Sequence, residues 1–531
     1  MRVAVWRRLL GQSGTLEEGL NILDQETHSD EVILPEAPTD EEKYLYLHTR
    51  RMFIVGYGMF SCIPLSIGLW LFTLSSIEFI WFAIPAAFIS LYLLISYFGI
   101  AVWGKDFDMQ EHEKIVAKAE IEGMWPSVDV YLPCCGEDMQ ILQNTYEHVA
   151  KLVYDPRKIR VFVLDDSGKK TVEHMAHAFG FEYICRPDRG VMAKAGNLRY
   201  AFSRTCGQLF LILDADFCPR PDFLTETVPY FESDRSIAIL QTPQFFRWRA
   251  DQTWVERAAG VTQEIFYRLV QTNRQAHDAA ICVGTCGVYR RAALEPFGGT
   301  ALISYSEDVR SGFMVTDAGW KVKYVPLNLS TGACPDNCKA FFGQQMRWCM
   351  GSTTLCTSSD FWGSKLTTMQ KMCYSSGLGY YVATALSLFF APMPSMLLIL
   401  FRPQAVFWFN ICFAIPSMLM PFVALRIWST QPYHLDCIRI KTVQYLAHLF
   451  AIVDMICNTK LPWVATGASA AKKKTRFPRA MKFLMNFSLF QMILIWAGVA
   501  WRAQEYDLVN FLPTLILETV NIWIQLSVFY E

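Results

Sequence analysis

The sequence predicts an α/β domain inserted between two groups of membrane-spanning helices. Of the 531 residues, 52% are hydrophobic and 14% are aromatic, which is high for a purely soluble protein. Charge-free apolar runs lie near both ends of the chain, whereas residues 105–361 carry short apolar runs separated by charged or glycine-containing segments. The net charge of −1 gives no overall basic field to attract nucleic acid, so we expect no nucleic-acid partner.

The first membrane unit is a predicted hairpin at residues 49–104, which follows an acidic, mobile tail at residues 1–48. The two apolar runs of the hairpin, 53–73 and 79–103, are each long enough to cross a hydrocarbon core of about 30 Å at about 1.5 Å per residue. Basic residues flank both open ends of the hairpin. By the positive-inside tendency these ends, and the N-terminus with them, are predicted to lie in the cytosol.

The second membrane unit occupies residues 362–531. We expect four further spans there, at residues 372–401, 405–425, 483–501 and 508–530. Charged side chains interrupt residues 435–457, which favours an amphipathic helix in the cytosolic interface; a seventh span is the alternative. Two spans before the α/β domain and four after it keep both termini on the cytosolic side.

Carboxylates follow two predicted strands of the α/β domain. Candidate strands lie at residues 128–132, 159–164, 182–185, 209–213 and 237–241. Asp165 and Asp166 follow the second strand, and Asp214 and Asp216 follow the fourth. In a mainly parallel, doubly wound sheet, ligands bind outside the carboxyl ends of the strands. An Asp-x-Asp at such a point can direct oxygen ligands toward Mg²⁺ or Mn²⁺, and the metal can bridge the phosphates of a nucleotide.

A third acidic element, Ser306-Glu307-Asp308, is a candidate source of a general base. Transfer of a group to an acceptor hydroxyl needs a carboxylate that takes the proton of the hydroxyl, and Asp308 is our candidate. The same residues also fit the start of a helix with Ser306 as its N-cap. The local pattern leaves both interpretations open.

Two further motifs have the chemistry of a phosphate and sugar site. Lys194-Ala195-Gly196-Asn197 predicts a loop that contacts a nucleotide, since glycine permits close backbone approach and lysine offsets negative charge. In Gln344-x-x-Arg347-Trp348, the guanidinium can hold a diphosphate by two hydrogen bonds, and the indole offers a flat face of the kind sugar rings stack upon. A structural cation–π pair is the alternative for the second motif.

Taken in order, these motifs resemble those of the processive family 2 glycosyltransferases, which include bacterial cellulose synthase, hyaluronan synthase and fungal relatives. The resemblance covers roughly residues 128–477. It rests on Asp165-Asp166, Lys194-Ala-Gly-Asn197, Asp214-Ala-Asp216, Gln241-Thr-Pro-Gln-Phe-Phe246, Ile281-Cys-Val-Gly-Thr285, Ser306-Glu-Asp308 and Gln344-x-x-Arg-Trp348. It implies a GT-A, Rossmann-like catalytic domain in the cytosol, and a fungal membrane enzyme is the specific expectation.

The resemblance implies a role for each matching residue. Asp214 and Asp216 would hold the metal and the diphosphate, Asp308 would act as general base, and Trp348 would stack on the acceptor sugar. The other implied substrate-binding residues are Glu137, Asp165, Asp166, Lys194, Asn197, Val283, Gly284, Thr285, Glu307, Gln344, Arg347 and Thr466. Of these, Asp165 and Asp166 would hold the nucleoside and Arg347 the diphosphate. Thr466 belongs to a segment at residues 461–478 that resembles a gating loop over the bound nucleotide.

Three positions depart from the pattern of the family. The first-strand motif, commonly Pro-Thr-Tyr-Asn-Glu, is here Pro133-Cys134-Cys135-Gly136-Glu137, which keeps the glutamate and loses the aromatic ring. Phe217 stands where several relatives have a metal-ligating histidine. Ile281-Cys282-Val283 replaces a Phe-Phe-Cys, which leaves the identity of the sugar open.

The expected function is that of a membrane-embedded, inverting hexosyltransferase. It would polymerise a UDP-sugar, UDP-glucose or UDP-N-acetylglucosamine, into a cell-wall or extracellular polysaccharide and translocate it across the plasma membrane. The expected partners are the UDP-sugar, the growing polysaccharide, Mg²⁺ or Mn²⁺, and the lipid bilayer. One alternative is a non-processive transferase that acts on a lipid such as ceramide or a polyprenyl phosphate. Another is an inactive, transferase-like transporter or scaffold.

Overall fold

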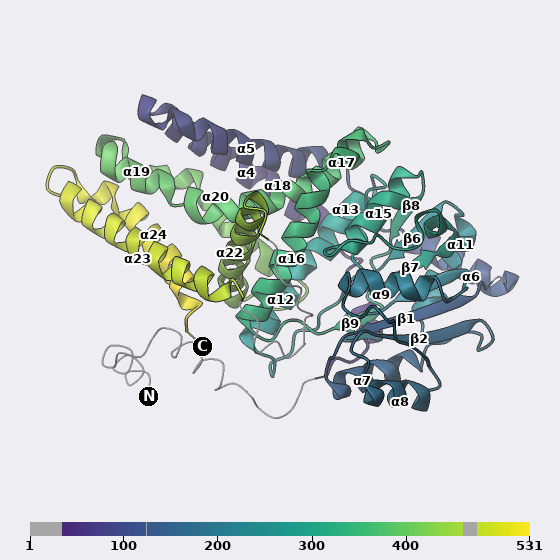
Figure 1. The fold of residues 1–531 in the computed structure, drawn as a ribbon. Helices are drawn as coiled ribbons and strands as arrows, with labels where there is room; N and C mark the ends of the chain where they lie inside the picture. The colour runs from purple at the N-terminus through teal and green to yellow at the C-terminus, as the bar shows by residue number, and fades with distance from the viewer. Residues whose placement is uncertain (1–33, 124, 460–474, 531) are drawn as a thin grey trace, which may run out of the picture. The chain divides into compact units, whose positions relative to one another are not determined.

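Seven strands form the main sheet in the computed structural model, which describes residues 34–123, 125–459 and 475–530 (Figure 1). The strand order is β3-β2-β1-β4-β7-β6-β8, and all strands run parallel except β7, which is antiparallel to both neighbours. The bounds are β1 Val128–Cys134, β2 Ile159–Asp165, β3 Glu182–Ile184, β4 Leu209–Ile212, β6 Ile237–Gln241, β7 Gly287–Arg290 and β8 Lys321–Tyr324. A second sheet pairs β5 Phe217–Pro219 with β9 Ser330–Gly332.

Helices cover the main sheet, and α9 packs against β1 and β2. In Figure 1, α7 and α8 lie on the other side of these strands from α9. The helices of this domain are α6 Met109–Glu122, α7 Met139–Val149, α8 Lys170–Ala178, α9 Ala193–Phe202, α10 Phe223–Thr227, α11 Pro229–Ser233, α12 Trp254–Glu264, η4 Ile265–Gln271, α13 Thr272–Gln275, α14 Arg291–Leu294, η5 Glu295–Phe297 and α15 Glu307–Asp317. The predicted α/β domain is therefore confirmed.

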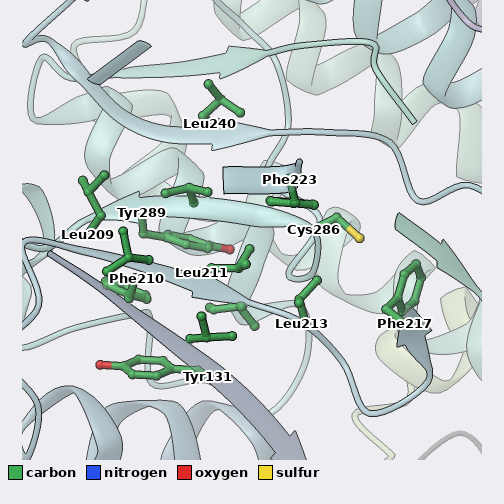
Figure 2. Close-up of a cluster of buried hydrophobic side chains, with 14 of the residues drawn as sticks. Tyr131, Leu209, Phe210, Leu211, Leu213, Phe217, Phe223, Leu240, Cys286 and Tyr289 are labelled. Carbon is green, nitrogen blue, oxygen red and sulfur yellow. The ribbon is translucent and has the colours of Figure 1, made fainter. Parts of the chain in front are cut away.

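Aromatic side chains stack across the middle of the main sheet. The ring centroids of Tyr131 and Phe210 are 5.1 Å apart, and those of Phe210 and Tyr289 are 5.0 Å apart with nearly parallel planes. Figure 2 shows the three rings on β1, β4 and β7 among buried leucines. Offset stacks of this kind add about 0.5–1.5 kcal/mol per pair beyond the area they bury. The first pair joins β1 to β4, and the second joins β4 to the antiparallel strand β7.

Four helices among the described residues are long and apolar enough to cross a membrane. They are Arg51–Leu74 (α4), Ile77–Trp103, Thr368–Phe401 and Phe477–Arg502 (α23). Ile77–Trp103 combines η1 Ile77–Phe82, α5 Ala83–Leu93, η2 Leu94–Ile100 and η3 Ala101–Trp103, and Thr368–Phe401 combines α18 Thr368–Phe390 with α19 Met393–Phe401. They correspond to four of the six predicted spans, two on each side of the α/β domain.

The other two predicted spans differ in form. Residues 405–425 are divided into η6 Pro403–Ala405, η7 Trp408–Phe413, α20 Ile415–Leu419, η8 Met420–Ala424 and α21 Leu425–Trp428. Pro416 and Pro421 are the second residues of two of these pieces, where the missing N–H and the fixed φ of proline interrupt a continuous helix. Residues 508–530 form η9 Leu508–Asn510 and a 16-residue helix, α24 Leu512–Ser527.

Three helices pack together beside the α/β domain, and one of them is the first part of the candidate span Thr368–Phe401. They are α16 Cys338–Cys356, α18, and α22 Asp436–Ile456, and each packs against the other two. Asn337 caps α16 by accepting a hydrogen bond from the N–H of Ala340 at 2.9 Å. Between α16 and α18 lies the short helix α17 Ser359–Gly363. The predicted helix at residues 435–457 corresponds to α22, which is not among the four candidate spans; its place at an interface stays a prediction.

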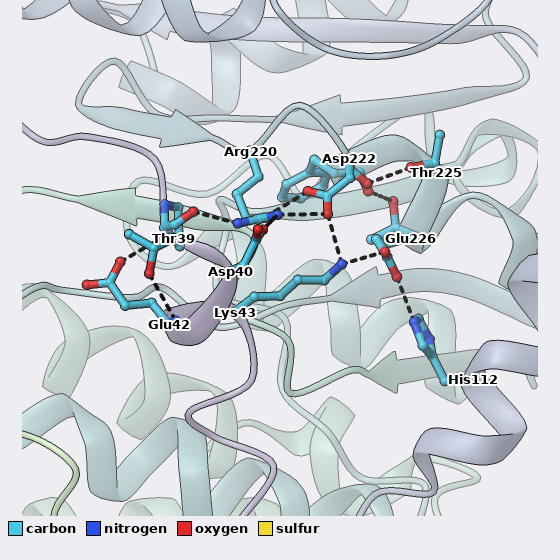
Figure 3. A network of polar contacts seen from close by, with 12 residues as sticks. Thr39, Asp40, Glu42, Lys43, His112, Arg220, Asp222, Thr225 and Glu226 are labelled. Atoms are coloured by element: carbon cyan, nitrogen blue, oxygen red, sulfur yellow. Dashed lines mark hydrogen bonds and ion pairs between the residues drawn. The ribbon is translucent and has the colours of Figure 1, made fainter.

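Part of the segment before α4 is docked on the α/β domain. Lys43, at the end of α3 (Asp40–Lys43), forms ion pairs with Asp222 at 2.8 Å and Glu226 at 2.5 Å, and His112 contacts the other oxygen of Glu226 at 2.7 Å (Figure 3). Arg220 donates to the carbonyl of Pro38 at 2.7 Å. These contacts anchor the described residues that precede the first span.

Candidate active site

The candidate site lies at the carboxyl ends of four parallel strands, as the sequence predicts. Glu137 follows β1, Asp165 ends β2, Asp214 follows β4, and Gln241 ends β6. Strand β1 pairs with both β2 and β4, so the loops that leave these three strands start side by side. The structure therefore brings together the motifs that lie after separate strands in the sequence.

Asp165 is fully engaged by the protein. Its oxygens accept hydrogen bonds from the N–H and hydroxyl of Ser167 at 2.7 and 2.6 Å, from the N–H of Lys169 at 3.1 Å, and from the hydroxyl of Tyr183 at 2.9 Å. A buried carboxylate needs such donors to offset the loss of water. In this state Asp165 shapes the turn after β2, and its contact with a nucleoside stays a prediction.

Asp166 forms a buried, two-point ion pair with Arg186, which no sequence motif indicated. Both nitrogen–oxygen distances are 2.6 Å, and the two side chains are 4% and 1% exposed. Arg186 also donates to the carbonyls of Val191 at 2.6 Å and Ala193 at 3.1 Å. The pair thereby shapes the loop that leads into Lys194. The only signal in the sequence is an arginine directly after the third strand.

Asn197 also makes a structural contact. Its side-chain N–H donates to the carbonyl of Leu164 at 2.7 Å, which ties α9 to the end of β2. The residue is 2% exposed. Its position supports the loop that carries Lys194, and a direct contact with substrate stays a prediction.

Lys194 joins the carboxylate loop after β4 to the segment that precedes β7. Its ammonium pairs with Asp214 and donates to the carbonyl of Gly284 at 2.8 Å. Burial alone would lower the pKa of Lys194, but the charges of Asp214 and Glu307 raise it above its usual value, so the side chain stays cationic. The hydroxyl of Thr285 accepts a hydrogen bond from the N–H of Asp214 at 2.9 Å. The predicted residues of both motifs therefore meet in one place.

Asp214 and Asp216 fit a divalent cation. Burial, and then the charge of Asp214, raise the pKa of Asp216 to about 7, so a cation bound beside these carboxylates would favour the ionised form of Asp216. Carboxylate oxygens are the ligands that Mg²⁺ and Mn²⁺ prefer. Within the described ranges no group of three or more His, Cys, Asp or Glu side chains is placed to hold a metal. Water and phosphate oxygens would therefore complete the coordination.

Glu137 follows β1 and interacts electrostatically with Asp214 and Asp165. Its side chain accepts a hydrogen bond from the N–H of Cys135 at 2.6 Å. Burial raises the pKa of Glu137, and the nearby charges of Asp214 and Asp165 act in the same direction. The site thus concentrates negative charge where the sequence predicts a metal and a nucleotide.

The third acidic element begins α15, as the helix interpretation predicts, but Ser306 does not cap it. Ser306 has φ of +51°, and its side chain makes no capping bond. Asp308 lies against Gly284, where an added Cβ would be 2.9 Å from its Oδ2. Burial, and then the charge of Glu307, raise the pKa of Asp308 to about 7. Burial likewise raises the pKa of Glu307. A carboxyl with a pKa near neutrality is suited to accept a proton.

Gln344, Arg347 and Trp348 lie on α16, and all three are half-buried. Burial lowers the pKa of Arg347 to about 10, and Tyr305 opposes this shift. Helix α16 approaches the loop before α15 so closely that a Cβ at Gly351 would clash with the hydroxyl of Ser306. This contact brings the face of α16 near Asp308. Thr466 lies outside the described residues.

Comparison with known proteins agrees with this geometry. Residues 209–426 match the family model described as glycosyl transferase family group 2. The catalytic subunit of the UDP-forming cellulose synthase 1 from Komagataeibacter xylinus is 33% identical over 259 residues, which are 48% of this chain and 34% of that protein. The corresponding subunit from Pseudomonas fluorescens is 30% identical over 262 residues, 48% of this chain and 35% of that protein. The chain therefore spans about a third of the length of these relatives.

A solved mannosyltransferase from Pyrobaculum calidifontis, in complex with GDP-Man and Mn²⁺, is 15% identical and covers 66% of this chain and 97% of its own, with a TM-score of 0.46. The mixed sheet with carboxylates at its strand ends is consistent with this match to a glycosyltransferase family over residues 209–426. Residues 209–426 resemble family 2 glycosyltransferases, and about half of the chain is similar in sequence to cellulose synthase catalytic subunits. The predicted resemblance to family 2 glycosyltransferases is confirmed, and the fungal origin stays a prediction.

Proposed function

We propose that the protein is an inverting, UDP-sugar-dependent glycosyltransferase that extends a polysaccharide and passes it outward between its apolar helices. The observation that carries this proposal is that Lys194, on the donor side, and the candidate base Asp308, on the acceptor side, both contact Gly284. Its carbonyl accepts the hydrogen bond of Lys194, which is paired with Asp214, and a Cβ added at Gly284 would be 2.9 Å from Oδ2 of Asp308. The group that stabilises a leaving diphosphate and the group that activates an attacking hydroxyl would therefore contact the same segment. The UDP-forming relatives support UDP-sugar as the donor.

The reaction follows from the positions of these groups. Asp308 takes the proton of the acceptor hydroxyl, whose oxygen attacks the anomeric carbon from the face opposite UDP. The bond from the anomeric carbon to the diphosphate breaks, and UDP leaves with the electron pair. Lys194 and Arg347 stabilise the charge that develops on the diphosphate. A divalent cation, when bound by Asp214 and Asp216, would neutralise part of the same charge.

The apolar helices support a membrane site for this reaction. Candidate spans on both sides of the catalytic domain, and basic residues at the open ends of the first hairpin, favour a cytosolic position of the catalytic domain, and the resemblance to fungal members suggests the plasma membrane. The polysaccharide would leave through the helices that follow α16. Resemblance to fungal members suggests a cell-wall or outer-surface polymer as the product.

The decisive experiment is a donor screen with the detergent-solubilised protein. Radiolabelled UDP-glucose, UDP-N-acetylglucosamine and UDP-glucuronate are each incubated with Mg²⁺ or Mn²⁺, and both UDP release and product size are measured. We expect a polymer of high molecular mass from one of these donors, and no activity after chelation of the metal. A one-sugar lipid would replace the polymerase by the lipid-modifying alternative. Equal UDP release by wild type and Asp308→Asn would reject the catalysis proposed here.

A further inference from the structure

The segment Ile281-Cys282-Val283-Gly284-Thr285 is irregular, and side chains take up its backbone hydrogen bonds. Gln241 is fully buried, and its side-chain oxygen accepts a hydrogen bond from the N–H of Val283 at 2.9 Å. The amide nitrogen of Gln241 donates to the carbonyl of Thr285 at 2.7 Å. A buried backbone needs such partners where no neighbouring strand supplies them. Gln241 thus holds the end of the segment nearest the catalytic groups.

Gln271 holds the other end of the same segment. Its side-chain oxygen accepts from the N–H of Ile281 at 2.9 Å, and its side-chain nitrogen donates to the carbonyl of Ile281 at 2.6 Å. Gln271 is also fully buried. One amide therefore satisfies both backbone groups of one residue, as a neighbouring strand would do. Both backbone hydrogen bonds of Ile281 are made by this single side chain, while its own side chain packs against a buried hydrophobic cluster.

This segment connects the donor side of the candidate site to its acceptor side. Gly284 accepts from Lys194 on the donor side and lies against Asp308 on the acceptor side, and Thr285 accepts from the N–H of Asp214. A displacement of the segment would change the distance between the base and the donor. Geometry of this kind governs whether the acceptor hydroxyl, rather than water, receives the sugar.

The helix that carries Gln271 begins at a buried ion pair beside the membrane helices. Gln271 is the last residue of η4, and Arg268 in the same helix pairs with Glu264 at 2.7 Å. Arg268 donates to the carbonyl of Trp428 at 2.6 Å, and Glu264 accepts from the N–H of Thr430 at 2.9 Å. Arg268 also donates to the carbonyl of His48, shortly before α4. Helix η4 is a π-helix, and π-helical turns frequently occur at functional sites.

We infer that Gln271 is a positioning residue for the acceptor, because it holds the backbone of Ile281–Thr285 in place. Through the helix that carries Gln271, the position of this segment depends on the junction at Arg268 between the catalytic domain and the apolar helices. This inference rests on the proposed function, since it requires a donor and an acceptor. It assigns Gln271 no contact with either. Its effect is on the fraction of sugar transferred rather than on donor binding.

The test compares Gln271→Met with Gln275→Met. Gln275 provides a matched control. Its side-chain oxygen also accepts a hydrogen bond from a backbone N–H, that of Tyr324 at 2.5 Å, but Tyr324 lies outside the segment Ile281–Thr285. Using the labelled donor that the screen identifies, one measures KM for the donor and the labelled sugar incorporated per UDP released. For Gln271→Met we expect this ratio to fall about tenfold with donor KM within about twofold of wild type, since small misplacements of reacting groups cost up to ~10²-fold. Gln275→Met should keep the ratio of wild type.

Equal ratios for the two methionine variants, or a rise in donor KM that accounts for the whole loss, would overturn the inference. If Gln271→Met does not yield monodisperse protein, Gln271→Glu gives the same comparison, because it keeps the acceptor for Ile281 N–H and loses the donor to its carbonyl. Arg268→Met, which lies farther from the segment, should lower the ratio in the same direction; an unchanged ratio there would reject the link to the junction. Absence of UDP release by wild type from every donor would instead reject the proposed function.

Discussion

The base assigned to Asp308 predicts a specific dependence of the rate on pH. Burial and the charge of Glu307 raise the pKa of Asp308 to about 7, so the carboxylate that accepts the proton is present above neutrality and is lost as the pH falls. At pH 6 about one tenth of these carboxyls are ionised, and at pH 8 about nine tenths, so the rate should rise about tenfold between these values. Asp308→Asn should lower kcat by roughly 10²–10⁴-fold and remove this dependence.

The assay is UDP release from saturating donor between pH 5.5 and 9. Asp317→Asn is the matched control on the same helix, because Asp317 accepts from the N–H of Lys365, away from Gly284. It should keep the acid limb of wild type. A flat wild-type profile from pH 6 to 8, or an Asp308→Asn variant with more than half of the wild-type rate, would show that another group takes the proton. The raised pKa also means that this carboxyl contributes less to the unfolding free energy as the pH rises from about 4 to about 7.

Three further substitutions test the structure around the site. Arg186→Met leaves a buried carboxylate without its cation, so we expect the free energy of unfolding to fall by about 3–5 kcal/mol in chemical denaturation; a loss below about 1 kcal/mol would contradict the structural role. Gly351→Ala forces α16 away from Ser306 and should lower kcat about tenfold or more, whereas Gly363→Ala, which meets open space, should not. Arg347→Lys keeps the charge and loses the planar fork, so kcat should fall by roughly 10²-fold in steady-state kinetics, and a change under twofold would exclude diphosphate binding.

The sequence predicted the parallel strands that lead into the site and missed the strands beyond them. Residues 128–132, 159–164, 209–213 and 237–241 are mainly apolar runs, and the corresponding strands β1, β2, β4 and β6 begin at the predicted residues. Strands β7 and β8 have four residues each, and β8 alternates between buried and more exposed side chains at the edge of the sheet. Runs this short carry little periodic signal.

The motifs placed the carboxylates at the strand ends but could not show which of them the fold itself uses. Asp165 and Asp166 look equivalent to Asp214 and Asp216 in the sequence, yet the first pair is saturated by protein donors. The partner of Asp166 is Arg186, 20 residues away with no fixed spacing to either motif. Long-range pairs of this kind follow from the packing of β2 against β3, which a local pattern does not encode.

The antiparallel strand β7 has a consequence for the order in which the chain can fold during synthesis. Strands β1 to β4 can pair as soon as residue 212 has emerged, but the free edge of β4 is closed only by β7, which ends at residue 290. The interval is 290 − 212 = 78 residues, or roughly 4–16 s at a synthesis rate of about 5–20 residues per second. During that time an apolar strand edge is open to wrong partners. Ribosome-bound chains of increasing length should therefore gain protease resistance in β4 only after β7 emerges, and an earlier gain would argue against this order.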